Sequence, residues 1–308
     1  MKGTAVSVES AHRGEAPLWF RLGRRVQEIG RLMRLDRPIG IWLLMWPMLW
    51  ALWIAGDGRP RADLLIIFLA GAAVMRSAGC VINDFADRNL DPFVRRTRDR
   101  PLAARRIAPL ESLVLFACLI AIALVLALQL DILTLELACV GAALAVSYPF
   151  FKRFFPLPQL YLGIAFGWAV PMAFAAQTGH IDRIGWLVFL AAVIWALIYD
   201  TLYAMADRAD DAALGVRSSA ILFGDLDRVA IALLQLLMLA ALVMIGTNEQ
   251  LGRWYFAGVG AAGLFFLYQQ WLIRVRAPAD CFAAFLNNNY VGMAVFIGLM
   301  LDKLYRAA

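Results

Sequence analysis

Residues 76–100 read RSAGCVINDFADRNLDPFVRRTRDR, an apolar stretch that gathers an arginine, an asparagine and spaced carboxylates before it enters a basic loop. If residues 64–87 form a helix, these polar side chains share a face, because their spacings of seven, four and three residues match whole turns. They are Arg76, Asn83, Asp84 and Asp87, and Asp91 extends the row by another four positions. Charged residues inside an apolar segment are costly and usually face a functional interior. The stretch is therefore the first candidate site.

The rest of the chain has the composition of a membrane protein. Of its 308 residues 62% are hydrophobic and the mean hydropathy is +0.70, whereas soluble domains are roughly half apolar. Apolar runs long enough to cross a bilayer occur at 39–56, 63–83, 110–130, 132–150, 160–178, 185–206, 229–246, 252–273 and 283–301. We expect an all-α integral membrane protein with nine transmembrane helices in a domain of residues 39–308.

Residues 1–38 precede the first span and are predicted to form a cytoplasmic tail followed by a basic interfacial helix. Apolar residues recur at helical spacing between Leu18 and Leu32, with arginines among them. If the amino terminus lies inside, the inward segments hold 22 of the 29 Lys and Arg residues, a strong positive-inside bias. That bias accounts for the net charge of +6 without a nucleic-acid partner.

The polar stretch contains the pattern N-x-x-x-D-x-x-x-D at Asn83, Asp87 and Asp91, called here the first acidic motif. Helical residues four apart are neighbours, so adjacent carboxylates can share a divalent ion. Mg²⁺ characteristically takes one or two carboxylates, keeps water and completes its shell with phosphate oxygens. The alternative is that the carboxylates only neutralise the arginines of the following loop.

A second acidic motif makes simple neutralisation of the loop arginines a weaker explanation. Asp207-Arg208 and Asp211 repeat the D-R-x-x-D pattern of the first motif, and Asp200 lies seven residues earlier on the same helical face. The sixth and second spans cross the membrane in the same direction, so both motifs are expected on the cytoplasmic side. Two acidic motifs that face one cavity could hold two metal ions around one diphosphate.

Three further features have open interpretations. Trp42, Trp46, Trp50 and Trp53 form an aromatic stripe that either packs against neighbouring helices or lines a cavity. Lys152 and Arg153 are either positive-inside charges or ligands of a diphosphate. Asn287, Asn288 and Asn289 open the last expected span, where at least one of them is expected to cap the helix.

Several segments in order resemble the UbiA superfamily of intramembrane aromatic prenyltransferases. They are RLDRPIGIWLLMWPMLWALW, NDFADRNLD with RDRPL, SYPFFKR with LPQ, YDTLYAMADRADD with LGVRSSAILFG, and NNNYVG, and together they cover roughly residues 34–293. The YDTLYAMADRADD form and the RLDRPIG start are similar to the 4-hydroxybenzoate subgroup. The resemblance implies nine helices around a central cavity in the bacterial inner membrane, with the amino terminus and the site on the cytoplasmic side.

The implied activity is transfer of a polyprenyl group from polyprenyl diphosphate to 4-hydroxybenzoate in ubiquinone biosynthesis, with Mg²⁺ as cofactor and membrane lipid around the prenyl tail. By the same resemblance, Arg76 would hold the acceptor's carboxylate. The metal ligands would be Asn83, Asp87, Asp91, Asp207 and Asp211, and the diphosphate ligands would be Arg96, Arg100 and Lys152. Asp87 and Asp207 would also be central to catalysis, and Asp200 is the candidate to orient or deprotonate the phenol, with Tyr203 nearby.

Two alternatives remain at this point. Another acceptor, such as a naphthoate, homogentisate or haem, is compatible with the acidic motifs, although an arginine matched to a small carboxylate argues against larger acceptors. A cation or phosphate transporter is the alternative from another class, because intramembrane carboxylates also mark ion paths. Against it, the acidic residues collect at one membrane face and do not continue across.

Overall fold

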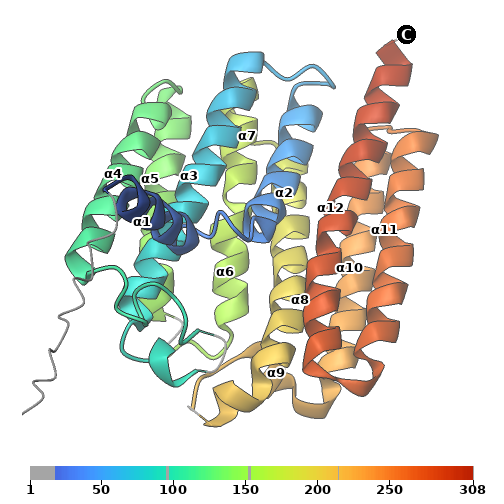
Figure 1. The fold of residues 1–308 in the computed structure, drawn as a ribbon. Coiled ribbons are helices and arrows are strands. Elements are labelled where there is room, and N and C mark those ends of the chain that lie inside the picture. Colours follow the sequence, from blue (N-terminus) through green and yellow to red (C-terminus); the bar gives the residue numbers. More distant parts are fainter. Residues whose placement is uncertain (1–17, 95–96, 152–153, 214, 308) are drawn as a thin grey trace, which may run out of the picture.

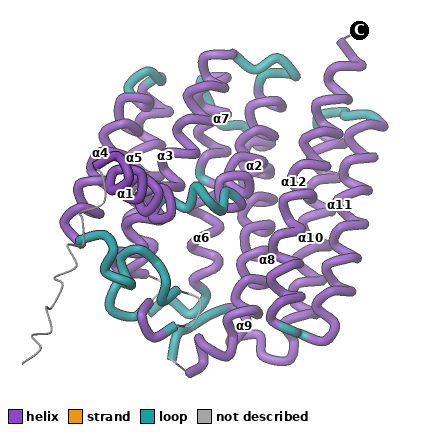
Figure 2. Tube along the Cα trace, in the orientation of Figure 1, coloured by secondary structure: helices purple, strands orange, loops and turns teal. Residues whose placement is uncertain are grey.

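The computed structural model describes residues 18–94, 97–151, 154–213 and 215–307, and within these ranges the fold is helical with no β-strand (Figures 1 and 2). The α-helices are α1 (Leu18–Leu32), α2 (Ile39–Ala55), α3 (Ala62–Asp87), α4 (Pro109–Ala127), α5 (Ile132–Phe151), α6 (Pro158–Gly167), α7 (Ala169–Thr178), α8 (Arg183–Ala213), α9 (Ser219–Phe223), α10 (Asp227–Asn248), α11 (Arg253–Leu272) and α12 (Pro278–Ala307). Short 3₁₀ segments lie at Asp91–Phe93, Gly224–Leu226 and Ile273–Val275.

The predicted nine spans correspond to the described helices. Eight helical segments are long and apolar enough to cross a membrane, and α2 is a shorter apolar helix of 17 residues. The fifth span is broken into α6 and α7 at Trp168. Pro171 explains the break, because a proline nitrogen cannot donate to the carbonyl four residues earlier, that of Gly167.

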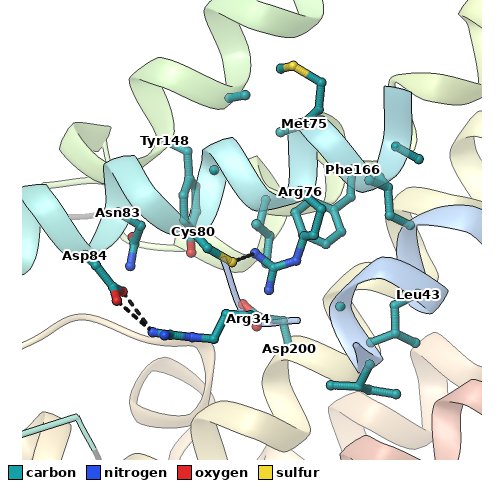
Figure 3. Close-up of a pocket in the computed structure, with 18 of the residues that line it drawn as sticks. Arg34, Leu43, Met75, Arg76, Cys80, Asn83, Asp84, Tyr148, Phe166 and Asp200 are labelled. Atoms are coloured by element: carbon teal, nitrogen blue, oxygen red, sulfur yellow. Dashed lines mark hydrogen bonds and ion pairs between the residues drawn. The ribbon is translucent and has the colours of Figure 1, made fainter. Parts of the chain in front are cut away.

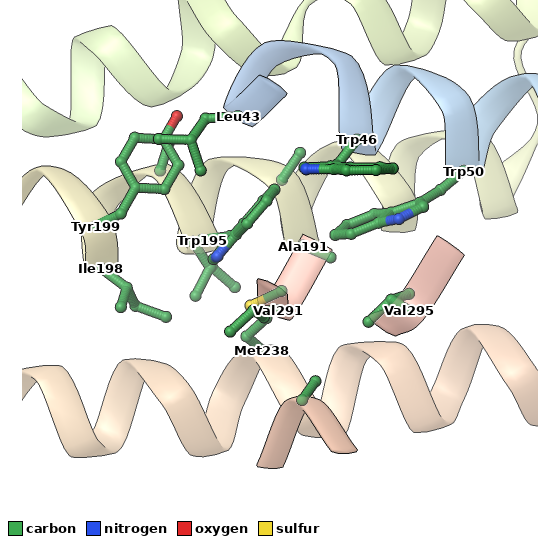
Figure 4. Close-up of a cluster of buried hydrophobic side chains, with 14 of the residues drawn as sticks. Leu43, Trp46, Trp50, Ala191, Trp195, Ile198, Tyr199, Met238, Val291 and Val295 are labelled. Carbon is green, nitrogen blue, oxygen red and sulfur yellow. The ribbon is translucent and has the colours of Figure 1, made fainter. Parts of the chain in front are cut away.

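The centre of the bundle is packed by aromatic residues of α2, α8 and α12. The rings of Trp50 and Trp195 stack with centroids 5.3 Å apart, and both side chains are buried (Figure 4). Each indole donates a hydrogen bond to α12: Trp50 to the carbonyl of Gly292 at 3.1 Å and Trp195 to the amide oxygen of Asn288 at 3.0 Å. The tryptophan stripe therefore packs against neighbouring helices, which was one of the two interpretations of the sequence. Of its four members, only Trp42 is substantially exposed.

The asparagines of α12 do not cap a helix, so that expectation was wrong. The helix begins at Pro278, and Asn287, Asn288 and Asn289 lie in its third and fourth turns. Each accepts a hydrogen bond from another helix: Asn287 from Gln269, Asn288 from Trp195 and Asn289 from Trp46. They satisfy buried donors between helices, which is a frequent use of amides in membrane bundles.

The amphipathic helix α1 has the predicted bounds and lies crosswise to the long helices (Figure 1). Its exposed side carries Trp19, Leu22 and Val26, whereas Leu32 is buried against α3. Charged contacts attach α1 to the start of α4, with an ion pair between Arg25 and Glu111 and one between Glu28 and Arg106 at 3.0 Å. The carboxyl end of α1 is thereby fixed beside the polar end of α3.

Candidate functional site

A cavity of about 1160 Å³ runs between helices α2 to α8 and is also lined by α12. One end is polar, and every described residue of the predicted site lines this cavity: Arg76, Asn83, Asp87, Asp91, Arg100, Asp200, Tyr203, Asp207 and Asp211. The remainder is mostly apolar, with walls from α4, α5 and α7. Two predicted residues, Arg96 and Lys152, lie outside the described parts of the chain. The two acidic motifs are thus brought into one cavity, as expected.

Helix geometry places the side chains on each wall. Asp200, Tyr203, Asp207 and Asp211 are separated by three, four and four residues, so they form one row along α8. On α3, Asn83 and Asp87 are one turn apart. Asp91 was expected to continue that helical row, but α3 ends at Asp87 and Asp91 begins a separate 3₁₀ turn. Pro92 prevents the α-helix from continuing, because its nitrogen cannot donate to the carbonyl four residues earlier, that of Arg88.

Asp84 is the most buried carboxylate of this end, at 1% exposure. Arg34, just beyond α1, donates from Nη2 to both of its oxygens at 2.9 Å (Figure 3). Arg100 donates from Nη1 to Asp84 and to Asp91, each at 3.0 Å. Asp84 therefore links α1, α3 and the basic loop, and its two arginines compensate its charge.

The carboxylate of Asp91 pairs with one arginine among the described residues, Arg100, whereas Asp84 pairs with two. Burial raises the pKa of Asp91 above its ordinary value, and the nearby Arg100 only partly opposes that rise. The hydroxyl of Thr97 donates to the backbone carbonyl of Asp91 at 3.0 Å and fixes the turn. A carboxylate in this setting is stabilised by any further positive charge beside it.

Arg76 lies deeper in the cavity than the first acidic motif. Its Nη1 contacts the thiol of Cys80 at 2.7 Å, and its guanidinium carbon lies 5.5 Å from the centre of the Phe166 ring. Figure 3 shows it above Asp200 and beside Cys80. Within the described residues its buried Nε has no hydrogen-bond partner, and no carboxylate pairs with it. A guanidinium whose partners are a thiol and a ring face can form charge-assisted hydrogen bonds with an anionic ligand.

The donor set is compatible with Mg²⁺. Both motifs offer amide and carboxylate oxygens, the hard ligands that this ion prefers. Within the described residues, no three His, Cys, Asp or Glu side chains form a group that could hold a metal ion. The described residues therefore contain no metal site formed by three or more such protein side chains.

Sequence reasoning gave no role to three residues of this cavity. Asp84 was placed on the correct helical face, but its partner Arg34 is fifty positions away. Tyr148 of α5 also lines the cavity, beside Asn83 in the view of Figure 3. The available signals were the RLDRPIG and SYPFFKR segments, which contain Arg34 and Tyr148 but do not indicate what they contact.

Comparison with known proteins gives a consistent result. The UbiA prenyltransferase family matches residues 44–295. A protein of Nitrosococcus oceani named 4-hydroxybenzoate octaprenyltransferase is 56% identical over 274 residues, which cover 89% of this chain and 96% of that protein. A protein of Alkalilimnicola ehrlichii with the same name is 53% identical over 278 residues, covering 90% of this chain and 95% of the relative.

Solved structures with the same fold include a UbiA homologue from Aeropyrum pernix K1 in its apo form. It superposes with a TM-score of 0.74 at 25% identity and covers 84% of this chain and 97% of its own. A UbiA homologue from Archaeoglobus fulgidus, bound to GPP and Mg²⁺, superposes with a TM-score of 0.67 at 15% identity, covering 87% of this chain and 99% of its own. At the latter identity the likeness supports the fold alone.

Proposed function

Because the chain belongs to the UbiA prenyltransferase family, we propose that it transfers a polyprenyl group to the ring carbon ortho to the hydroxyl of 4-hydroxybenzoate. Polyprenyl diphosphate is the donor, diphosphate is released, and the product belongs to ubiquinone biosynthesis. The relatives that are more than half identical over nearly their whole length carry the name of this activity. The observation that supports it best in this chain is Arg76, a guanidinium without a carboxylate partner in the described cavity, close to two acidic motifs.

The diphosphate would bind at the polar end of the cavity. Asn83, Asp87 and Asp91 from one side and Asp207 and Asp211 from the other would hold Mg²⁺, which when bound neutralises the leaving diphosphate. Arg100 lies at the same end and would add a fixed positive charge. Arg96 and Lys152, which lie outside the described residues, are proposed as further ligands of the diphosphate. Preorganised charges of this kind stabilise a developing anion without reorganisation.

The prenyl tail would occupy the apolar part of the cavity and reach membrane lipid. Breaking the allylic C–O bond leaves a carbocation, which requires a site with little water. Phe166, Tyr199, Phe282 and Phe285 line the cavity, and their ring faces can stabilise a cation. The side chains of this chain would thus exclude water and stabilise the charge at the reacting carbon.

The acceptor would be held by Arg76 through its carboxylate. Its ring carbon then attacks the carbocation that remains after the C–O bond to diphosphate has broken, and a base in the cavity takes up the proton from that ring carbon. Asp200 lines the same cavity and would orient or deprotonate the phenol, with Tyr203 one turn further along α8. The acceptor is thereby fixed at one end by charge and at the other by a hydrogen bond.

The chain is a multi-pass membrane protein, and we place it in the bacterial inner membrane with its amino terminus and active site on the cytoplasmic side. The distribution of Lys and Arg supports this orientation. Labelling of single cysteines introduced at Arg59 and at Asp99, which lie in loops at opposite ends of α3, would test it with a membrane-impermeant reagent. Reaction at Asp99 from outside intact cells would contradict the orientation.

The function is tested by incubating the purified protein with Mg²⁺, 4-hydroxybenzoate and a series of prenyl diphosphates, followed by mass spectrometry. We expect 3-polyprenyl-4-hydroxybenzoate and free diphosphate. The variants Asp87→Asn and Asp207→Asn serve as inactive controls for the two motifs. Absence of product with every donor, from protein that binds prenyl diphosphate, would contradict the proposal.

A further inference from the structure

Gly40 lies in the first turn of α2, where its backbone meets the guanidinium of Arg76. Gly40 is buried. An ideal Cβ built on it would stand 2.5 Å from Nη2 of Arg76 and 2.8 Å from Cζ, and closer still to Nε. Real Cβ atoms do not approach other heavy atoms so closely. The guanidinium therefore fills the space that any other residue at position 40 would occupy.

The local structure gives no reason for a glycine there. Gly40 is the second residue of α2, and it does not have a positive φ angle that would require glycine. A tertiary contact is therefore the physical explanation for the missing side chain. Among the atoms within reach of a Cβ at position 40, the three nearest all belong to Arg76.

Three neighbours define the orientation of the guanidinium. Cys80 accepts from Nη1, the ring of Phe166 lies over the group, and Gly40 faces the Nε and Nη2 edge. Cys80 is on the same helix one turn further along, so it cannot by itself limit how far the arginine swings toward α2. The backbone of Gly40 provides that limit.

We propose that Gly40 is a positioning residue for the acceptor: it admits the guanidinium of Arg76 against α2 and so sets where the carboxylate of the aromatic substrate binds. This inference rests on the proposed function, because it assigns the carboxylate to Arg76. A Cβ at position 40 moves the guanidinium away from α2 into the cavity. The carboxylate and the ring attached to it then shift relative to the allylic carbon.

The test is the variant Gly40→Ala, with Gly260→Ala as the matched control. Gly260 also lies inside a membrane-spanning helix, α11, but a Cβ there would meet no atom within 4 Å. For Gly40→Ala we expect kcat/KM for 4-hydroxybenzoate to fall at least about tenfold, as for a weakened hydrogen bond to a charged group. KM for prenyl diphosphate should change less than twofold, and Gly260→Ala should resemble the wild type in both.

The double variant Gly40→Ala/Arg76→Ala tests the physical link. Once the guanidinium is absent, the methyl group at position 40 displaces nothing, so kcat/KM for the aromatic acid should equal that of Arg76→Ala alone. If Gly40→Ala fails to accumulate, the double variant should restore accumulation for the same reason. A further loss of activity or continued failure to accumulate in the double variant would overturn the role of Gly40.

The outcomes separate this inference from the proposed function. A wild-type protein that never prenylates 4-hydroxybenzoate contradicts the function itself. An active wild type whose Gly40→Ala variant shows equal changes for both substrates, or no change for either, contradicts only the role of Gly40.

Discussion

Arg34 is expected to stabilise the site through a single buried carboxylate, and its replacement by alanine offers a quantitative test. Arg34 donates to both oxygens of Asp84 at 2.9 Å, and Asp84 is almost wholly buried. Breaking a buried ion pair costs about 3–5 kcal/mol when the remaining charge has no partner. Here Arg100 still pairs with Asp84 and the Arg34 side chain is 22% exposed, so we expect about 1–3 kcal/mol.

Alanine is the suitable replacement, because Arg34 has a φ of 59° and alanine keeps the Cβ that makes this conformation unfavourable. Glycine would relieve that strain and obscure the result. A loss of 1–3 kcal/mol corresponds to a fall in Tm of roughly 2–5 °C for a chain of this size, at an unfolding entropy of about 2.1 cal/mol/K per residue. The assay is the thermal unfolding of detergent-solubilised protein, followed by intrinsic tryptophan fluorescence.

Arg37 provides the matched control three residues later. Its side chain is 74% exposed, and its ion pair with Asp36 is long at 4.0 Å, so Arg37→Ala should change Tm by about 1 °C or less. The variant Arg34→Ala/Asp84→Asn should recover part of the lost stability, because the neutral amide no longer needs a charged partner. Equal effects of Arg34→Ala and Arg37→Ala, or no recovery in the double variant, would refute the reasoning.

Other predictions concern the metal site and the packing of the bundle. Asp87→Asn and Asp207→Asn should each reduce Mg²⁺-dependent turnover at least about 100-fold, and a fully active variant of either, measured at saturating substrates, would refute the shared site. Chelation with EDTA should abolish turnover and added Mg²⁺ should restore it; turnover that persists after dialysis against chelator would contradict the need for a divalent ion. Gly258→Ala should lower Tm by several degrees, because its Cβ would lie 2.5 Å from the carbonyl oxygen of Ala294, whereas Gly260→Ala should not; equal Tm values would contradict the packing argument.

Hydropathy and helical spacing were sufficient to predict the spans, the existence of helix α1 and the meeting of the two acidic motifs in one cavity. These features depend on local periodicity and on the direction in which helices cross the membrane. Where a local signal was overlooked, the prediction failed: Asp91 does not continue the helical row, because Pro92 cannot donate the next hydrogen bond of an α-helix. The asparagines of α12 were misplaced because their helix begins nine residues earlier, at Pro278.

The rest depends on contacts between residues that are distant in sequence. Nothing local indicates that Arg34 pairs with Asp84, or that Gly40 gives room to Arg76. Such contacts are set by how the helices cross, and helix spacing alone does not determine the crossing. The roles proposed for the site residues remain predictions that the experiments above address.

The most direct test of the central claim compares the kinetics of the wild type and of Arg76→Ala with both substrates. If Arg76 holds the acceptor's carboxylate while the acidic motifs hold the diphosphate, KM for 4-hydroxybenzoate should rise about 10- to 100-fold, as for loss of a charged hydrogen bond. KM for prenyl diphosphate should stay within twofold of the wild type. Equal increases in both constants, or an unchanged KM for 4-hydroxybenzoate, would contradict the account.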